Sequence, residues 1–426
     1  MNLNSPVAHT LTLNKFIGLL IVVAICGYMS VRGLMNSVLI LLFLISVLYT
    51  AISRHYLYSK TQTSTLKWMS VFLAAPFTAV LIAQSLRMHY DWQEFDAPLR
   101  MLCSIPVMWL LYWRKIQFTR LLFYSVPLSL LILVVIMNLN PAPLANWGGR
   151  FSTYFADCDT FGVYGMVLLA LCLFFPYSRQ HNFLSAWNIA GVILGLYLVI
   201  GSQTRTAWLN IPFLVAVWLY FNFQKLKFGR FFKLFVATTI ILFAISQLSM
   251  TSTRITTGHT ELVGWFSGNN TNTSAGQRLT MWQMSWELIK RNPILGYGDY
   301  DYMSFMNEPW ITSISSPADR TIITVGPHNE FLASLLRSGI FGGIAVLLKL
   351  CGPLIVFWQK RNTGTVEIDE AARLGVAVII CLIVSSLGFE VLTLKYTASF
   401  FGLIIAGLTA QIAWAQDNTF ALNREF

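Results

Sequence analysis

The chain has 426 residues, of which 56% are hydrophobic and only 11% carry a charge. A soluble globular domain needs more polar surface than this composition supplies, so the sequence excludes that class and predicts a polytopic membrane protein. The formal net charge of +11 does not predict a nucleic-acid partner, because no basic stripe carries interleaved aromatic residues. We expect the charge to come from basic loops that face the inner leaflet of a membrane.

Apolar runs long enough to cross a hydrocarbon core of about 30 Å follow one another along most of the chain. They are continuous instead of alternating, which favours helices over the strands of an outer-membrane barrel. We therefore predict an all-α membrane bundle of about twelve transmembrane helices, with eleven or thirteen left open because the run at 187–201 is short. The predicted spans lie near 15–31, 34–52, 66–86, 99–114, 119–138, 160–176, 187–201, 206–224, 231–249, 331–358, 373–390 and 396–415.

The loops predict which side of the membrane each segment faces. The loops on the same side of the membrane as the N-terminus are short and basic, as in QKLKFGRFFK. The loops on the opposite side hold most of the acidic residues. Basic loops tend to stay in the cytoplasm. We therefore expect both termini to be cytoplasmic and the longer loops to lie on the outer face.

The predicted domains are helices one to nine over 1–249, a large outer loop over 250–327, helices ten to twelve over 328–415 and a cytoplasmic tail over 416–426. The loop is too long for a plain connection and is rich in Ser, Thr, Asn and Gly, which favours a cap over an external cavity. Its segment GQRLTMWQMSWELIKRNP predicts an amphipathic helix. The apolar face that we assign to this helix carries Leu279, Trp282, Trp286 and Ile289.

A histidine lies where the polar loop meets a hydrophobic helix, in the sequence Pro327-His328-Asn329. Its imidazole has an ordinary pKa of about 6.5 and so could act as a base near neutral pH, although a plain interfacial histidine is the simpler interpretation. Asn329 could orient the ring or bind a sugar hydroxyl. Arg337, inside the following span, should face protein or water instead of lipid, and Gly339 would allow a close helix contact.

Four outer arginines could bind an anion. Arg278 falls in the first turn of the predicted loop helix, where a cation opposes the helix dipole by about 0.3–1 kcal/mol. Arg205 is held in a very short loop, and Arg150 and Arg100 lie at similar depths in neighbouring outer loops. Each of them alone is explained by a surface or snorkelling cation. Together, guanidinium groups could bind a diphosphate in bidentate fashion.

Several kinds of chemistry have no support in the sequence. No His or carboxylate follows His328 at helical metal-ligand spacing, and no phosphate-binding loop, nucleophile elbow or dinucleotide fingerprint is present. We therefore predict an enzyme without a metal, a redox cofactor or ATP.

Three motifs carry a resemblance to a known family. His328-Asn329 is followed by nine residues and then by Gly339-Ile340-Phe341-Gly342. The pattern R-x-x-x-L occurs at 205–209, and a G-x-R, NP and G-x-G series occurs across 276–298. In these features the chain resembles the O-antigen ligases, which are grouped with O-antigen polymerases and protein O-oligosaccharyltransferases.

The resemblance implies a GT-C-like protein of the bacterial inner membrane that moves O-antigen glycan from undecaprenyl diphosphate to lipid A-core at the periplasmic face. It implies an inverting reaction without metal, ATP or another cofactor, and partners that are membrane lipids instead of nucleic acid. It assigns His328 as the base or acceptor-positioning residue, and Arg205 and Arg278 as diphosphate ligands. The expected substrate-binding residues are Arg150, Arg100, Asn329 and Arg337.

Other functions remain open at this point. A polymerase would use the same donor but a second lipid-linked glycan as acceptor. The single dominant outer loop favours the ligase. A protein oligosaccharyltransferase is a third alternative, although nothing in the chain resembles its extra periplasmic domain. A flippase for lipid-linked glycans would need paired charges across several spans, and only Arg337 and Lys349 lie inside predicted spans and away from their ends.

Overall fold

The computed structural model describes residues 6–53, 64–140, 147–175, 182–222, 229, 236, 249–267, 272–299 and 301–422. All regular secondary structure in these residues is helical. Helices occupy every predicted span except 231–249, most of which lies outside the described residues. Their bounds are α1 Pro6–Cys26, α2 Leu34–Ile52, α3 Ser64–Arg87, α4 Asp96–Trp113, α5 Phe118–Leu139, α7 Cys158–Phe174, α8 Asn182–Ser202, α10 Asn210–Asn222, α16 Glu330–Lys360, α17 Val366–Ser386 and α18 Lys395–Leu422.

Five of the described helices, α2, α3, α5, α16 and α18, are long and apolar enough to cross a membrane. The all-α bundle with membrane helices is thereby confirmed, whereas the count of about twelve spans and the GT-C-like arrangement stay predictions. The last helix also continues to Leu422, beyond the predicted start of the tail at 416.

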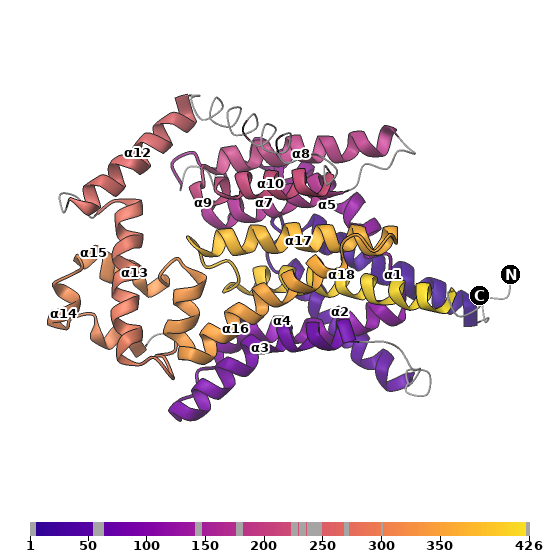
Figure 1. Ribbon diagram of the computed structural model, residues 1–426, viewed down its shortest axis with the longest axis horizontal. Coiled ribbons are helices and arrows are strands. Elements are labelled where there is room, and N and C mark those ends of the chain that lie inside the picture. The colour runs from indigo at the N-terminus through magenta and orange to yellow at the C-terminus, as the bar shows by residue number, and fades with distance from the viewer. Residues whose placement is uncertain are drawn as a thin grey trace.

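Two helices form the centre of the bundle. α17 and α18 pack against each other, with α7, α8 and α10 on one side and α2, α3 and α4 on the other (Figure 1). The apolar part of α18 is completely buried. A helix that is apolar on all faces is stable only when other helices surround it, which explains why this segment lies at the core.

The segment predicted as the large outer loop forms a group of helices, which we call the cap, at one end of the bundle, opposite the end at which α18 finishes (Figure 1). It contains α12 (Ser249–Phe266), α13 (Ser274–Arg291), α14 (Pro309–Thr312) and α15 (Pro317–Ile322). α13 crosses the end of the bundle and packs against α12, α15 and α16. The loop thus folds into helices over one end of the bundle, whereas its role as a periplasmic cap stays a prediction.

The buried face of α13 differs from the predicted one. Met281, Met284 and Leu288 are buried in a small core of the cap, whereas Trp286 is 53% exposed. These three residues form a second apolar stripe at helical spacing. That stripe faces α15 and α16, because the chain beyond α13 folds back over it. Ile289 is buried, as predicted.

α16 is not one straight helix. Regular geometry is interrupted at Ser338 and at Gly339, where φ is +57°. Lys349 Nζ nevertheless donates a hydrogen bond to the Glu330 carboxylate, nineteen residues earlier in the chain. A straight helix would separate these residues by about 28 Å at 1.5 Å per residue. The two halves of α16 therefore fold back toward each other, and the predicted span 331–358 is divided.

A short strap, residues 293–298, fits into this break. Its Tyr297 N–H donates to the Leu336 carbonyl oxygen at 2.8 Å, and the Ile340 N–H donates to the Pro293 carbonyl oxygen at 2.9 Å. A broken helix leaves backbone groups without helical partners, and the strap supplies partners for them. A Cβ on Gly339 would lie 2.1 Å from the Ile294 carbonyl oxygen, so only glycine fits. Two of the family motifs thus meet at this contact.

Candidate active site

Three of the four predicted outer arginines line one cavity of about 300 Å³ between the bundle and the cap. Arg150 precedes α7, Arg205 opens the single-turn helix α9 (Arg205–Trp208), and Arg278 lies in the first turns of α13. Trp282 and Gly388 also line the cavity. Segments that are distant in the chain therefore place their guanidinium groups around one space, which we call the arginine cavity.

Asp159 links two of these arginines. It lies in the first turn of α7, after the N-cap residue Asp157. Arg150 Nη2 is 2.9 Å from Asp159 Oδ1, and Arg278 Nη2 is 3.0 Å from Oδ2. Arg150 is held further by the Ser202 carbonyl oxygen at 2.9 Å from its Nε. One carboxylate thus fixes two guanidinium groups in position.

Glu261, on α12, holds the third arginine. Its two carboxylate oxygens accept hydrogen bonds from Arg205 Nη1 and Nη2 at 2.8 and 3.2 Å. It also accepts from the Ala275 N–H at the start of α13, at 3.2 Å. The three arginines face two carboxylates, so the cluster keeps a surplus of positive charge. A bound anion with several oxygens could take over these bidentate contacts.

His328 lies beside the arginine cavity. Trp282, which lines the cavity, donates from Nε1 to the Pro327 carbonyl oxygen at 3.0 Å. The imidazole stacks on Phe389, next to the cavity residue Gly388, with 6.2 Å between ring centroids and 21° between planes. The backbone of His328 has φ +51°, a left-handed conformation that costs a side-chain-bearing residue about 1–3 kcal/mol. Its surroundings therefore hold this turn in place.

Two effects lower the pKa of His328 below its ordinary value. Burial of the imidazole is the larger one, and the positive charge of Arg278 adds to it, while Asp159 acts in the opposite direction. Both lowering effects disfavour the protonated ring. The imidazole is therefore neutral near pH 7 and is able to accept a proton.

The other predicted site residues lie elsewhere or have structural partners. Asn329 caps α16: its Oδ1 accepts from the N–H groups of Phe331 and Leu332, and its Nδ2 donates to the Leu387 carbonyl oxygen at 3.0 Å. Arg100 lies in α4 and does not line the arginine cavity. Arg337 lines a different cavity of α16, as described below.

Sequence reasoning missed the two carboxylates of the site. Asp159 sits in the polar start of a span, and Glu261 sits in the outer loop, where an acidic residue is unremarkable. Neither has an arginine at helical spacing. A search for carboxylates at the outer ends of the spans would have found Asp159, but the partner of Glu261 is defined only by the packing of α12 against α13.

Comparisons with known proteins agree with the motifs. Residues 190–347 match the family model described as O-Antigen ligase. An uncharacterized protein of Haemophilus influenzae is 25% identical over 298 residues, which cover 68% of this chain and 72% of the relative. A general O-oligosaccharyltransferase of Acinetobacter baylyi is 25% identical over 296 residues, which cover 66% of this chain and 47% of the relative. The chain thus spans about half the length of the second relative.

The matched segment contains much of the site. It includes Arg205, Arg278 and His328 together with the strap and the break in α16. Residues 190–347 are therefore similar to the O-antigen ligase family, as the motifs predicted, and this similarity points to an enzyme of the glycosyltransferase type.

Proposed function

We propose that this protein is an O-antigen ligase that moves a glycan from undecaprenyl diphosphate to lipid A-core at the periplasmic face of the bacterial inner membrane. The observation that carries the proposal is the convergence of Arg150, Arg205 and Arg278 on one cavity beside His328. The arginines suit a diphosphate, and the histidine suits the activation of a hydroxyl group.

The reaction follows from these groups. The donor diphosphate binds the guanidinium groups and displaces part of their contact with Asp159 and Glu261. His328 accepts the proton of the acceptor hydroxyl as its oxygen attacks the anomeric carbon. The bond from that carbon to the diphosphate oxygen breaks, and undecaprenyl diphosphate leaves with the electron pair. Attack from the opposite face inverts the anomeric configuration, and the arginines stabilise the developing charge.

The test is transfer by the purified protein in lipid nanodiscs with undecaprenyl-diphosphate glycan and lipid A-core, in the presence of chelator and without nucleotide. We expect a glycan–lipid conjugate, and we expect His328→Ala and Arg278→Ala to abolish most of it. Lys290→Ala is the matched control, because Lys290 lies on the same helix as Arg278 and is half-exposed. Normal transfer by both site variants would contradict the mechanism.

A second candidate differs only in the acceptor. The Acinetobacter baylyi relative is named a general O-oligosaccharyltransferase, which favours a test with a protein acceptor. Offering a protein with exposed Ser and Thr residues, a second lipid-linked glycan or lipid A-core in parallel separates oligosaccharyltransferase, polymerase and ligase. Movement of the donor across the bilayer without any conjugate would instead indicate a flippase.

A further inference from the structure

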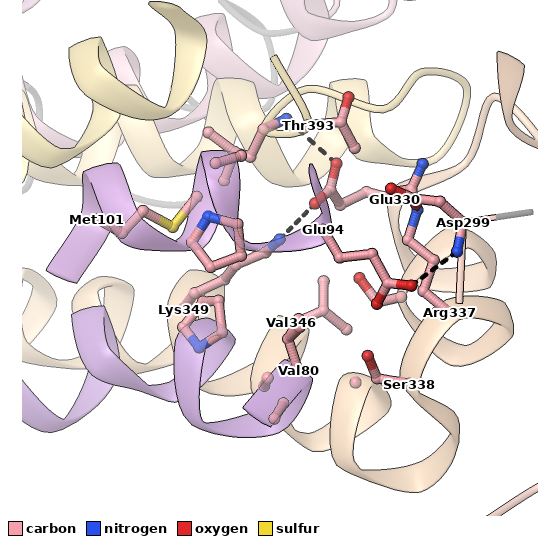
Figure 2. A pocket seen from close by; sticks show the side chains of 18 of the residues that line it. Val80, Glu94, Met101, Asp299, Glu330, Arg337, Ser338, Val346, Lys349 and Thr393 are labelled. Atoms are coloured by element: carbon pink, nitrogen blue, oxygen red, sulfur yellow. Dashed lines mark hydrogen bonds and ion pairs between the residues drawn. The ribbon is translucent and has the colours of Figure 1, made fainter. Parts of the chain in front are cut away.

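A second cavity, of about 120 Å³, lies on the α3 side of α16 and is lined by residues of α3, α4 and α16 (Figure 2). We call it the neutral cavity. A buried water needs about 10–15 Å³ by the same measure, so the neutral cavity has room for a much larger polar group. Figure 2 shows Glu94, Asp299, Glu330, Arg337 and Lys349 around this space.

Both cations of the neutral cavity have carboxylate partners, and the carboxylates outnumber them because Glu94 also lines the cavity. Lys349 pairs with Glu330, whose other oxygen accepts from the Leu392 N–H at 3.2 Å. Arg337 pairs with Asp299, and its Nη2 is 3.1 Å from Glu390 Oε2. Each cation thus has at least one carboxylate partner, and no positive surplus remains for a diphosphate.

The remaining chemistry of the neutral cavity suits hydroxyl groups. Carboxylate oxygens keep further lone pairs after one ion pair, and a hydroxyl group both donates and accepts. Ser334, Ser338 and Thr393 add hydroxyl groups to the same lining. Ionised groups buried at the depth of a membrane helix are costly and generally mark a functional site. An uncharged ligand with many hydroxyl groups, such as a sugar, fits this environment.

An apolar groove continues from the neutral cavity. It has a volume of about 400 Å³, lies between α3 and α16, and shares Ala79 and Ala345 with the cavity. Small side chains such as Ala75 open it, and Ile82 and Ile344 on its walls are 37% and 49% exposed. In a bilayer such a groove contacts lipid tails. A polar cavity joined to an apolar groove fits a molecule with a sugar head and hydrocarbon chains.

The neutral cavity also lies close to His328. Glu330 follows His328 by two residues. Glu390, the partner of Arg337, packs behind the same turn, because a Cβ on Gly326 would lie 1.9 Å from Glu390 Oε1. The arginine cavity reaches this turn through Trp282, whereas the neutral cavity reaches it through the start of α16. The two cavities thus border the histidine turn through different elements.

We propose that the neutral cavity and its groove bind the lipid-anchored acceptor, with sugars of lipid A-core in the cavity and acyl chains between α3 and α16. The proposal rests on the proposed function for the identity of the acceptor. The donor and the acceptor then occupy separate sites that share His328.

Two variants test the site from its two ends. Ala75→Phe fills the groove, and Ser334→Leu places an apolar side chain in the cavity. Both native residues are half-buried, so a larger side chain is tolerated better there than in the core. Leu347→Phe is the matched control, because Leu347 is 52% exposed on α16 and does not line the groove. Binding of fluorescent lipid A-core to nanodiscs is measured without donor, followed by KM values for both substrates.

We expect both variants to weaken lipid A-core binding and to raise its KM by about tenfold or more, with the donor KM within about twofold of wild type. Unchanged acceptor binding in both variants, or a loss of donor binding instead, would overturn the proposal. If lipid A-core binds the wild type and not the variants but no transfer occurs, the proposed function fails while the site stands. Transfer to a second lipid-linked glycan that both variants weaken would keep the site and change the acceptor.

Discussion

The arginine cavity and the neutral cavity both contain cations and carboxylates, but they differ in the balance of positive and negative charge. In the first, three guanidinium groups face Asp159 and Glu261, and the walls come partly from the cap. In the second, Lys349 and Arg337 are both paired with carboxylates, so no positive surplus remains, and most of the wall comes from α3, α4 and α16. A charged leaving group needs the first arrangement and a neutral sugar the second. The charge balance therefore separates the two substrates of a transferase.

His328 lies at the boundary between the two cavities, so its removal should have the largest effect. We expect His328→Ala to lower the rate of transfer by about 10²–10⁴-fold, which is typical for the loss of a general base. Binding of the donor and the acceptor should change little. Initial rates with saturating substrates, together with separate binding measurements, check this. A fall in binding that accounts for the whole loss would mean that the residue only shapes the turn.

Arg278 tests the arginine cavity alone. Arg278→Ala removes one guanidinium group from the departing diphosphate, and we expect a loss of about 10²–10³-fold in the rate of transfer. Arg278→Lys keeps the charge but not the bidentate geometry, so it should fall between the wild type and the alanine variant. Acceptor binding is the control and should stay at the wild-type value. Equal rates for the lysine variant and the wild type would reduce the role of Arg278 to charge alone.

Substitution of Lys349 tests how much the buried ion pair of the neutral cavity contributes to the stability of the fold. Both Lys349 and Glu330 are buried, so Lys349→Met alone leaves an unpaired carboxylate and should cost about 3–5 kcal/mol of unfolding free energy. The double variant with Glu330→Gln should recover most of this loss, because no buried charge remains. Thermal unfolding in nanodiscs gives the comparison. A double variant no more stable than the single one would show that the two side chains act independently.

The sequence predicted the parts of both cavities that local patterns reveal. Continuous apolar runs and the charges between them located the helices, and Arg205, Arg278 and His328 stood out because each is unusual at its position. The carboxylates that complete the arginine cavity did not stand out. Asp159 and Glu261 are ordinary residues, and their ion pairs with Arg278 and Arg205 span 119 and 56 residues of the chain. Ion pairs of this kind are set by packing and have no local signal.

The break in α16 shows the same limit. Gly339 was predicted to allow a close helix contact, but the backbone that approaches it is the Ile294 carbonyl oxygen of the strap, which is not helical. The sequence has no proline at the break, so an uninterrupted helix was the reasonable prediction. The cause lies in the strap at 293–298, which contacts α16 more than thirty residues further along the chain. Arg337 was predicted to face protein or water and to bind substrate beside the other arginines, but it lines a separate cavity.

The pH dependence of transfer gives the smallest and most specific effect. Transfer needs the neutral imidazole of His328, so the rate should rise as pH increases through its lowered pKa and then level off. The positive charge of Arg278 contributes to the lowering of that pKa. The midpoint of the pH–rate profile should therefore be unchanged in Arg278→Lys, which keeps the charge, and should move to higher pH in Arg278→Ala.

Glu390 provides the control for this profile, since burial raises the pKa of its carboxyl group to about 7. Glu390→Gln removes that second titration without changing Arg278 and Asp159, the charged groups that shift the pKa of His328. The midpoint assigned to His328 should therefore survive in Glu390→Gln and move in Arg278→Ala. The reverse result would link the histidine to the neutral cavity instead, because the charge that sets its pKa would then come from the Arg337 side.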